Sequence, residues 1–142
     1  MREHMGLFRG KRIDNGEWVE GFYIAHLKSA HYIIPCRTGG YASIYHGFYV
    51  HKWYEVDPDT VGECTGLRDK NGKLIFEGDI LDCKSGMYER CKVIFNEFCS
   101  AFQLMCADGF SDFFLCSIDY TEMEIIGTIH DNPKLLKGGE CE

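Results

Sequence analysis

Residues 56–81 read VDPDTVGECTGLRDKNGKLIFEGDIL, a stretch in which turn residues alternate with short apolar runs. Pro58 fixes its own φ angle, and the aspartates on either side of it favour a turn. Asn71-Gly72 lies between apolar segments and is a dipeptide that accepts positive φ at both central positions of a type I′ turn. Gly78 permits another turn before the next strand. The stretch therefore predicts short β-strands joined by tight turns.

Turn signals of the same kind occur on both sides of this stretch. Asn15-Gly16 predicts a hairpin that joins residues 6–13 to residues 17–25, where aromatic and β-branched side chains suit a pleated surface. Asp108-Gly109 predicts a further hairpin in the C-terminal half. Turn signals that recur about every 8–12 residues are typical of a β-sandwich or a small barrel. The sequence therefore predicts an all-β protein.

The strands between these turns are expected to be short. A second strand pair is expected at residues 30–35 and 41–50, with Thr38-Gly39-Gly40 as its connection. The remaining strands are expected at residues 74–76, 79–83, 89–96, 101–106, 113–117 and 124–130. Helical periodicity is weak throughout, and Asp131-Asn132-Pro133 predicts at most one short turn of C-terminal helix, within residues 131–137.

The pattern changes at residues 56–61, where aromatic strands give way to VDPDTV. We therefore expect residues 1–56 to form an N-terminal β-hairpin subdomain and residues 57–137 to form a compact barrel. The segment at 138–142, which begins with two glycines, is expected to be a flexible tail.

The composition is that of a packed globular protein. Of 142 residues, 45% are hydrophobic and 26% are charged, which is far from the composition of disordered chains. The net charge of −7 argues against sequence-independent binding to a nucleic-acid backbone. Residues 93–133 contain seven acidic residues and no Lys or Arg. These carboxylates either solvate the outer faces of strands and turns, or form an acidic surface that meets a basic partner or imitates nucleic-acid phosphates.

The eight cysteines would fit a disulfide framework only in a secreted protein. The first residues contain no hydrophobic segment of the kind found in a secretory signal peptide. No stretch of the sequence approaches the roughly 18 apolar residues of a membrane span. We therefore expect reduced thiols and a cytoplasmic protein. No C-x₂₋₄-C pair is present to form half of a structural zinc site.

Two groups of His and Cys residues are candidate metal ligands. His26, His31 and Cys36 lie close together in the sequence, and so do His46 and His51. Either group could converge on a metal across two strands, but partly buried histidines are common in aromatic-rich strands. The sequence predicts no metal site and no cofactor.

The stretch at residues 56–81 resembles the signature of the YopX family of phage and prophage proteins. In that signature, Pro-x-Thr-Val-Gly leads to Thr-Gly-Leu-x-Asp-x-Asn-Gly and then to Glu-Gly-Asp-Ile. The matching positions are Pro58, Thr60, Val61, Gly62, Thr65, Gly66, Leu67, Asp69, Lys70, Asn71, Gly72, Lys73, Ile75, Glu77, Gly78, Asp79 and Ile80. Residues 7–24 resemble the family's opening hairpin, and residues 124–136 resemble its closing segment. Cys64 departs from the pattern, and residues 25–55 match no fixed motif.

The resemblance implies an all-β protein encoded by phages or integrated prophages, hence one that works in a bacterial cytoplasm. It also implies that the part after Asn71 is similar to an SH3-like barrel. The family supplies no assigned mechanism, so the chemistry of the signature has to be judged from its residues.

Asp69, Glu77 and Asp79 are the candidate site residues of the signature. The favoured interpretation is that they satisfy backbone donors at the turns around Asn71-Gly72 and Gly78. The alternative is a carboxylate cluster, with Asp57 and Asp59 added, that holds Mg²⁺ or Ca²⁺ or acts as general acid and base. A nucleophilic pair of Cys64 with His130 is a weaker alternative. The common hydrolase, nucleotide-binding and zinc-protease motifs are absent from the sequence.

The function favoured by these observations is a non-catalytic protein-binding module with an acidic surface, whose partner is a phage or host protein. A basic protein is one candidate for this partner. Whether the protein is an enzyme stays open, and a carboxylate-dependent hydrolase is one alternative. The other alternative is a nucleic-acid-binding barrel with aromatic platforms. Arg2, Arg9, Lys11 and Arg12 form the only basic cluster, which makes nucleic acid the less favoured partner. Eleven of the 20 aromatic residues precede residue 57, so we also expect a homo-oligomer built through the N-terminal half.

Overall fold

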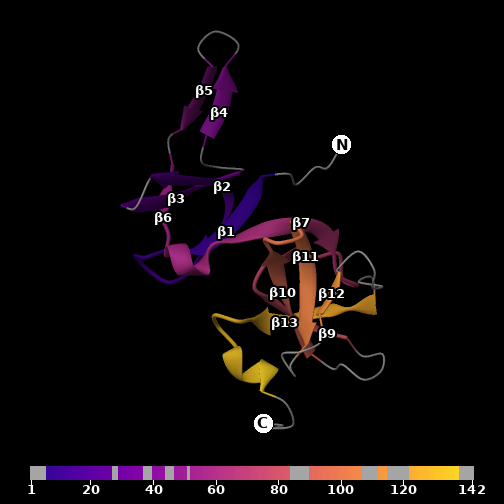
Figure 1. Ribbon diagram of the computed structural model, residues 1–142. Helices are drawn as coiled ribbons and strands as arrows, with labels where there is room; N and C mark the ends of the chain where they lie inside the picture. Colours follow the sequence, from indigo (N-terminus) through magenta and orange to yellow (C-terminus); the bar gives the residue numbers. More distant parts are fainter. Residues whose placement is uncertain are drawn as a thin grey trace. The chain divides into compact units, whose positions relative to one another are not determined.

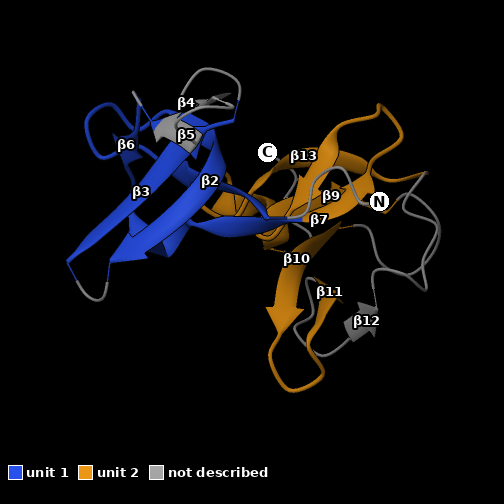
Figure 2. Cartoon of the chain, turned by 90° about the horizontal axis from the view of Figure 1, so that it is seen from above, with its two compact units in different colours: residues 1–64 blue, residues 65–142 orange. Residues whose placement is uncertain are grey.

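The computed structural model describes residues 6–26, 29–36, 40–43, 47–50, 52–83, 90–106, 112–114 and 122–137. The chain is all-β, as predicted, and within these ranges the only helical segments are short 3₁₀ turns (Figure 1). It divides into two compact units, unit 1 with residues 1–64 and unit 2 with residues 65–142 (Figure 2). The expected division into domains at residue 56 stays a prediction.

Unit 1 is built on an antiparallel sheet with the strand order β6-β3-β2-β1, and the first residues of β7 pair with β1. A separate two-stranded sheet consists of β4 and β5. The strands are β1 (Leu7–Lys11), β2 (Trp18–His26), β3 (Ala30–Pro35), β4 (Gly40–Ser43), β5 (Gly47–Val50), β6 (Tyr54–Glu55) and β7 (Gly62–Arg68).

The core of unit 1 lies on one face of this sheet. Val19, Ile33 and Val56 are buried there, and they are covered by partly buried neighbours. On the opposite face of β2, Phe22 and Ile24 are 46% and 49% exposed. The alternation along β2 therefore leaves one apolar row in solvent.

Gly21 of β2 lies against the neighbouring strand β3. A Cβ atom at this position would lie 1.9 Å from the carbonyl oxygen of Ile34. Only glycine therefore allows the two backbones to approach so closely.

The first hairpin is confirmed, because β1 and β2 pair from Leu7↔Phe22 to Lys11↔Trp18. Its turn is wider than predicted. The N–H of Gly16 donates to the carbonyl of Arg12 at 2.9 Å, which closes a four-residue loop, and Gly16 has a φ of 73°. Asn15 does not share the positive φ, because its Oδ1 accepts the N–H of Glu17 at 3.0 Å and holds an Asx turn. The prediction of a type I′ turn was therefore wrong here.

Residues 30–35 were predicted to pair with residues 41–50, and this pairing was wrong. β3 pairs along its whole length with β2 and, at Tyr32 and Ile33, with β6. β4 pairs with β5. Both edges of β3 are therefore taken by other strands, and the sequence neighbour β2 is the closest available partner. The expected connecting residues Thr38 and Gly39 lie outside the described residues.

Unit 2 contains the continuation of β7, its neighbour β8, and a five-stranded antiparallel sheet in the order β12-β11-β10-β9-β13. The strands are β8 (Leu74–Phe76), β9 (Asp79–Asp82), β10 (Arg90–Asn96), β11 (Ala101–Cys106), β12 (Asp112–Phe114) and β13 (Glu124–Thr128). The strands expected in this half are confirmed to within two residues wherever the chain is described. The SH3-like description of this unit stays a prediction.

The core of unit 2 contains aliphatic and sulfur-bearing side chains from β8 to β13. Its buried members are Ile75, Leu81, Cys83, Cys91, Val93, Leu104, Cys106 and Met123. The expected C-terminal helical turn is the 3₁₀ segment η4 (Pro133–Leu136). Asp108-Gly109 and residues 138–142 lie outside the described residues, although β11 and β12 pair as the third hairpin requires.

Candidate functional site

The signature begins with a 3₁₀ turn, η1 (Pro58–Thr60), that is fastened to β1. Asp57 caps this turn, because its Oδ1 accepts the N–H of Asp59 at 3.0 Å. The hydroxyl of Thr60 donates to the carbonyl of Asp57 at 2.7 Å and accepts the N–H of Lys11 at 2.8 Å. Thr60 is buried. The Pro-x-Thr pattern therefore serves to attach the turn to the sheet of unit 1.

Asp69 organises the next turn of the signature. Its Oδ1 accepts the N–H groups of Asn71 and Lys73, both at 2.9 Å, and its Oδ2 accepts the N–H of Ile125 at 3.1 Å. The N–H of Gly72 closes the turn on the carbonyl of Asp69 at 3.0 Å, and Gly72 has a φ of 79°. Asn71 does not share the positive φ, so this is a three-residue loop and not the predicted type I′ turn.

The electrostatics of Asp69 follow from these bonds. Burial by itself raises the pKa of Asp69, because it penalises the charged form. The N–H groups of Ile125, Lys73 and Asn71 stabilise the carboxylate and outweigh this penalty. The pKa of Asp69 therefore lies below its usual value, and the side chain is a carboxylate at neutral pH.

Asp79 has a similar local role at the following turn. Its side chain is 1% exposed, and its Oδ2 accepts the N–H of Phe76 at 2.8 Å. Gly78, with a φ of 91°, donates its N–H to the carbonyl of Val93 at 2.9 Å. Glu77, which lies between Phe76 and Gly78 in the sequence, is half-buried.

The two aspartates of the candidate cluster thus each bind backbone N–H groups of a different turn. Among the residues that the structure describes, no group of three His, Cys, Asp or Glu side chains could hold a metal ion. The shared carboxylate site of Asp69, Glu77 and Asp79 stays a prediction.

Several of the other candidate residues lie in the described part of the chain. Cys64 is buried, and Cys36 is exposed. His31 contacts the hydroxyl of Tyr23 through its Nδ1, and His26 lies 3.5 Å from the hydroxyl of Ser29. Burial raises the pKa of Tyr23. His46 and His51 lie outside the described residues.

Cations stacked on aromatic rings are a feature of unit 1 that the sequence reasoning did not find. The guanidinium of Arg9 and the ammonium of Lys11 lie 4.8 Å and 5.5 Å from the ring centroid of Trp18. Arg12 and Lys52 lie 3.9 Å and 5.8 Å from the ring of Tyr54. The only signal in the sequence is the basic run at residues 9–12, and it does not reveal which rings it meets.

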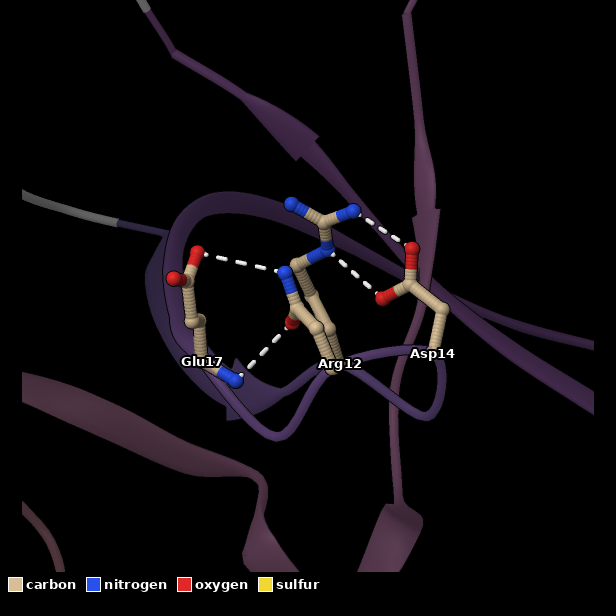
Figure 3. Close-up of polar contacts among 4 residues, drawn as sticks. Arg12, Asp14 and Glu17 are labelled. Carbon is tan, nitrogen blue, oxygen red and sulfur yellow. Dashed lines mark hydrogen bonds and ion pairs between the residues drawn. The ribbon is translucent and has the colours of Figure 1, made fainter.

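Arg12 is held by its own loop (Figure 3). Its Nε and one terminal nitrogen donate to the two carboxylate oxygens of Asp14 at 2.8 Å and 2.5 Å. The hydrogen bonds from Arg12 hold the pKa of Asp14 below its usual value. Across the same loop, the Asn15 amide donates to a carboxylate oxygen of Glu17 at 3.2 Å. This polar network fixes the tip of the first hairpin.

A second feature that the sequence did not reveal is the tip of the β10–β11 hairpin. Phe98 at this tip is 104% exposed. Its N–H donates to the Oδ1 of Asn96 at 2.9 Å, and the amide of Asn96 donates to the Oε1 of Gln103 at 3.1 Å. Ser100 has a φ of 52°. The loop is thus held by side-chain hydrogen bonds while it presents an apolar ring to solvent.

Two further rings lie at the base of this tip. Phe95 and Phe102 face each other across the hairpin, with ring centroids 5.2 Å apart in an edge arrangement. Phe95 is 38% exposed. We call Phe95, Phe98 and Phe102 the Phe98 tip.

The fold and these turns define an all-β protein in which side chains of the signature at residues 56–81 hold the backbone turns. The model of the YopX family, described as YopX protein, matches residues 7–137, and the chain therefore belongs to this family. A solved structure, described as the crystal structure of protein EF1440 from Enterococcus faecalis, is similar with a TM-score of 0.61 and 26% sequence identity. The similarity covers 91% of this chain and 96% of that chain. A search of curated proteins finds no match. Within the described part of the chain, no helix has the length and apolar content to cross a membrane.

Proposed function

We propose that this YopX protein is a non-catalytic protein-binding module of phage or prophage origin, which acts in the cytoplasm of the bacterial host. Its partner is a basic protein of the phage or the host. The observation that carries the proposal is the Phe98 tip, in which a fully exposed ring stands on a hydrogen-bonded loop.

Exposure of a complete phenylalanine ring favours a partner for energetic reasons. Burying such a side chain contributes about 1.5–3 kcal/mol. Aromatic anchors of this kind often dominate the binding energy of interfaces. The loop of Phe98 is already held by Asn96, so little ordering entropy is lost on binding.

The charge of the segment that contains the tip supports a basic partner. Glu97 is adjacent to Phe98 and is exposed, and so are Glu122 and Asp131 in the same unit. Residues 93–133 contain seven acidic residues and no basic ones. Charge complementarity then favours a partner whose apolar pocket is surrounded by Lys and Arg.

The test is affinity capture from an infected or lysogenic host with three forms of the full chain. These are the wild type, Phe98→Ala and the control Ile13→Ala, which truncates an exposed apolar side chain in unit 1. The proposal predicts a basic protein that is captured by the wild type and the control, is released by salt and is lost with Phe98→Ala. Capture that is equal for all three forms, or an acidic partner, would overturn it.

The stacked cations of unit 1 favour a second candidate function, the binding of single-stranded nucleic acid. Arg12 and Lys52 flank Tyr54, and the neighbouring Trp53 is 57% exposed, so a base could stack beside positive charge. Fluorescence anisotropy of a labelled single strand at low salt tests this candidate. An increase that Trp53→Ala removes supports it, and a flat titration with the wild type excludes it. The carboxylate-dependent hydrolase is the weakest candidate, because Asp69 and Asp79 already bind backbone N–H groups.

A further inference from the structure

Three thiols meet in the core of unit 2. Cys83 follows β9, Cys91 lies on β10, and Cys106 ends β11. They are 8%, 2% and 4% exposed, respectively. Cys91 and Cys106 are directly opposite each other in the antiparallel ladder, and their Sγ atoms lie 3.3 Å apart.

Cys83 belongs to the same buried core but does not share this contact. Its Sγ lies 3.8 Å from the carbonyl oxygen of Leu81 and 3.8 Å from the Sδ of Met123. Cys91 and Cys106 are therefore the two thiols in direct contact.

The two facing thiols need little movement to form a bond. A disulfide has an S–S length of about 2.05 Å, so the Sγ atoms of Cys91 and Cys106 have to approach by roughly 1.3 Å. Both residues lie on strands that pair over six consecutive positions, which keeps the thiols in register.

We propose that Cys91 and Cys106 form a reversible disulfide when the protein is oxidised by a hydroperoxide. One thiol of the pair, as its thiolate, attacks the peroxide and breaks its O–O bond. Its sulfur becomes a sulfenic acid, and the leaving oxygen takes a proton to form water or an alcohol.

The other thiol of the pair then closes the bond. Its sulfur attacks the sulfenic sulfur, which forms the Cys91–Cys106 disulfide and releases the second oxygen as water. In sum, Cys91 and Cys106 lose two protons and two electrons, and the peroxide takes them up.

The disulfide would connect the base of the hairpin that carries the Phe98 tip. Cys91 and Cys106 are 15 positions apart, and Phe98 lies between them in the sequence. Oxidation would therefore restrict this hairpin without touching the exposed ring. The inference does not depend on the proposed binding function, because its test measures thiols.

The test treats the reduced, folded full chain with one to ten equivalents of hydrogen peroxide and alkylates the remaining thiols after denaturation. The expected result is that six of the eight cysteines are alkylated and two are protected by the disulfide. Trypsin cuts after Arg90 and Lys92 and next after Lys134, so Cys91-Lys92 should be joined to residues 93–134. A second digestion with chymotrypsin separates Cys99, Cys106 and Cys116 and should place the link at Cys106. Reductant should restore all eight thiols.

Variants distinguish the facing pair from the third thiol. Cys106→Ala should abolish the link, and Cys83→Ala should leave the same pair joined. Cys64→Ala, which removes a buried thiol from unit 1, should leave the rate unchanged. The mapping of the wild type does not depend on how well any variant folds. Eight free thiols after treatment, or a link from Cys91 to any other cysteine, would overturn the proposal.

Discussion

The carboxylate of Asp69 accepts the backbone N–H of Ile125 at 3.1 Å, across 56 positions of sequence. The same carboxylate binds two N–H groups of its own loop. One side chain of the signature therefore shapes a hairpin turn and also fastens it to β13, which explains why an aspartate at this position serves the fold.

Removing this carboxylate should destabilise the protein strongly. Asp69→Ala removes the acceptor of three partly buried hydrogen bonds from backbone N–H groups, and we expect the free energy of unfolding to fall by about 3–5 kcal/mol. Urea denaturation followed by circular dichroism measures the change. Asp59→Ala removes an exposed carboxylate from the η1 turn and should change stability by less than about 0.5 kcal/mol. Equal losses for both variants would refute the role given to Asp69.

Asp69 should also make the stability depend on pH at the acidic end. Its pKa is lower in the folded state than its usual value, so its contribution is complete above the unfolded pKa of about 3.9 and is lost as pH falls through the folded pKa. The free energy of unfolding should therefore decrease below about pH 4. Asp69→Asn should reduce this decrease in measurements at several pH values, and an unchanged slope would contradict the assignment.

The approach of β2 to β3 at Gly21 gives a third prediction. Gly21→Ala would place a Cβ atom 1.9 Å from the carbonyl oxygen of Ile34, so the two strands would have to separate. We expect a loss of at least about 3 kcal/mol in the free energy of unfolding, which exceeds common overpacking costs. Thermal unfolding measures it. The control is Glu20→Ala, which changes the neighbouring exposed residue and should leave the stability nearly unchanged. If Gly21→Ala is as stable as the wild type, β2 and β3 are not as close at this position as described.

Self-association through unit 1 is a fourth prediction. Phe22 and Ile24 form an exposed apolar row on β2, and the sheets of two copies could cover these rows around a twofold axis. Light scattering under reducing conditions should give a multiple of the 16.3 kDa chain mass, and the double substitution Phe22→Ser with Ile24→Ser should restore the single chain. A wild-type mass that stays at one chain over micromolar concentrations would rule out this oligomer.

Local patterns were sufficient to predict much of the fold. Asn15-Gly16 and Asn71-Gly72 located two hairpins, and the strand bounds in unit 2 followed from alternation between turns. The conformations of these turns were not predictable in this way. Asn15 and Asp69 form side-chain hydrogen bonds with the backbone, and those bonds select wider loops than the dipeptides alone suggest.

The remaining features depend on contacts between distant residues. No local pattern indicates that Ile125 donates to Asp69 or that β3 pairs with β6. Phe98 was missed for a different reason, since a phenylalanine beside a predicted strand is usually assigned to the core. Its exposure follows from the loop that Asn96 closes, and this loop is visible only in the structure.

The most direct test of the central claim is a titration of the purified chain with its captured basic partner. Loss of the ring in Phe98→Ala should weaken binding by roughly ten- to a hundredfold, which corresponds to about 1.5–3 kcal/mol of buried apolar surface. Ile13→Ala should bind as the wild type does, and the unfolding midpoint of Phe98→Ala should be unchanged. A dissociation constant that is the same for Phe98→Ala and the wild type would contradict the account.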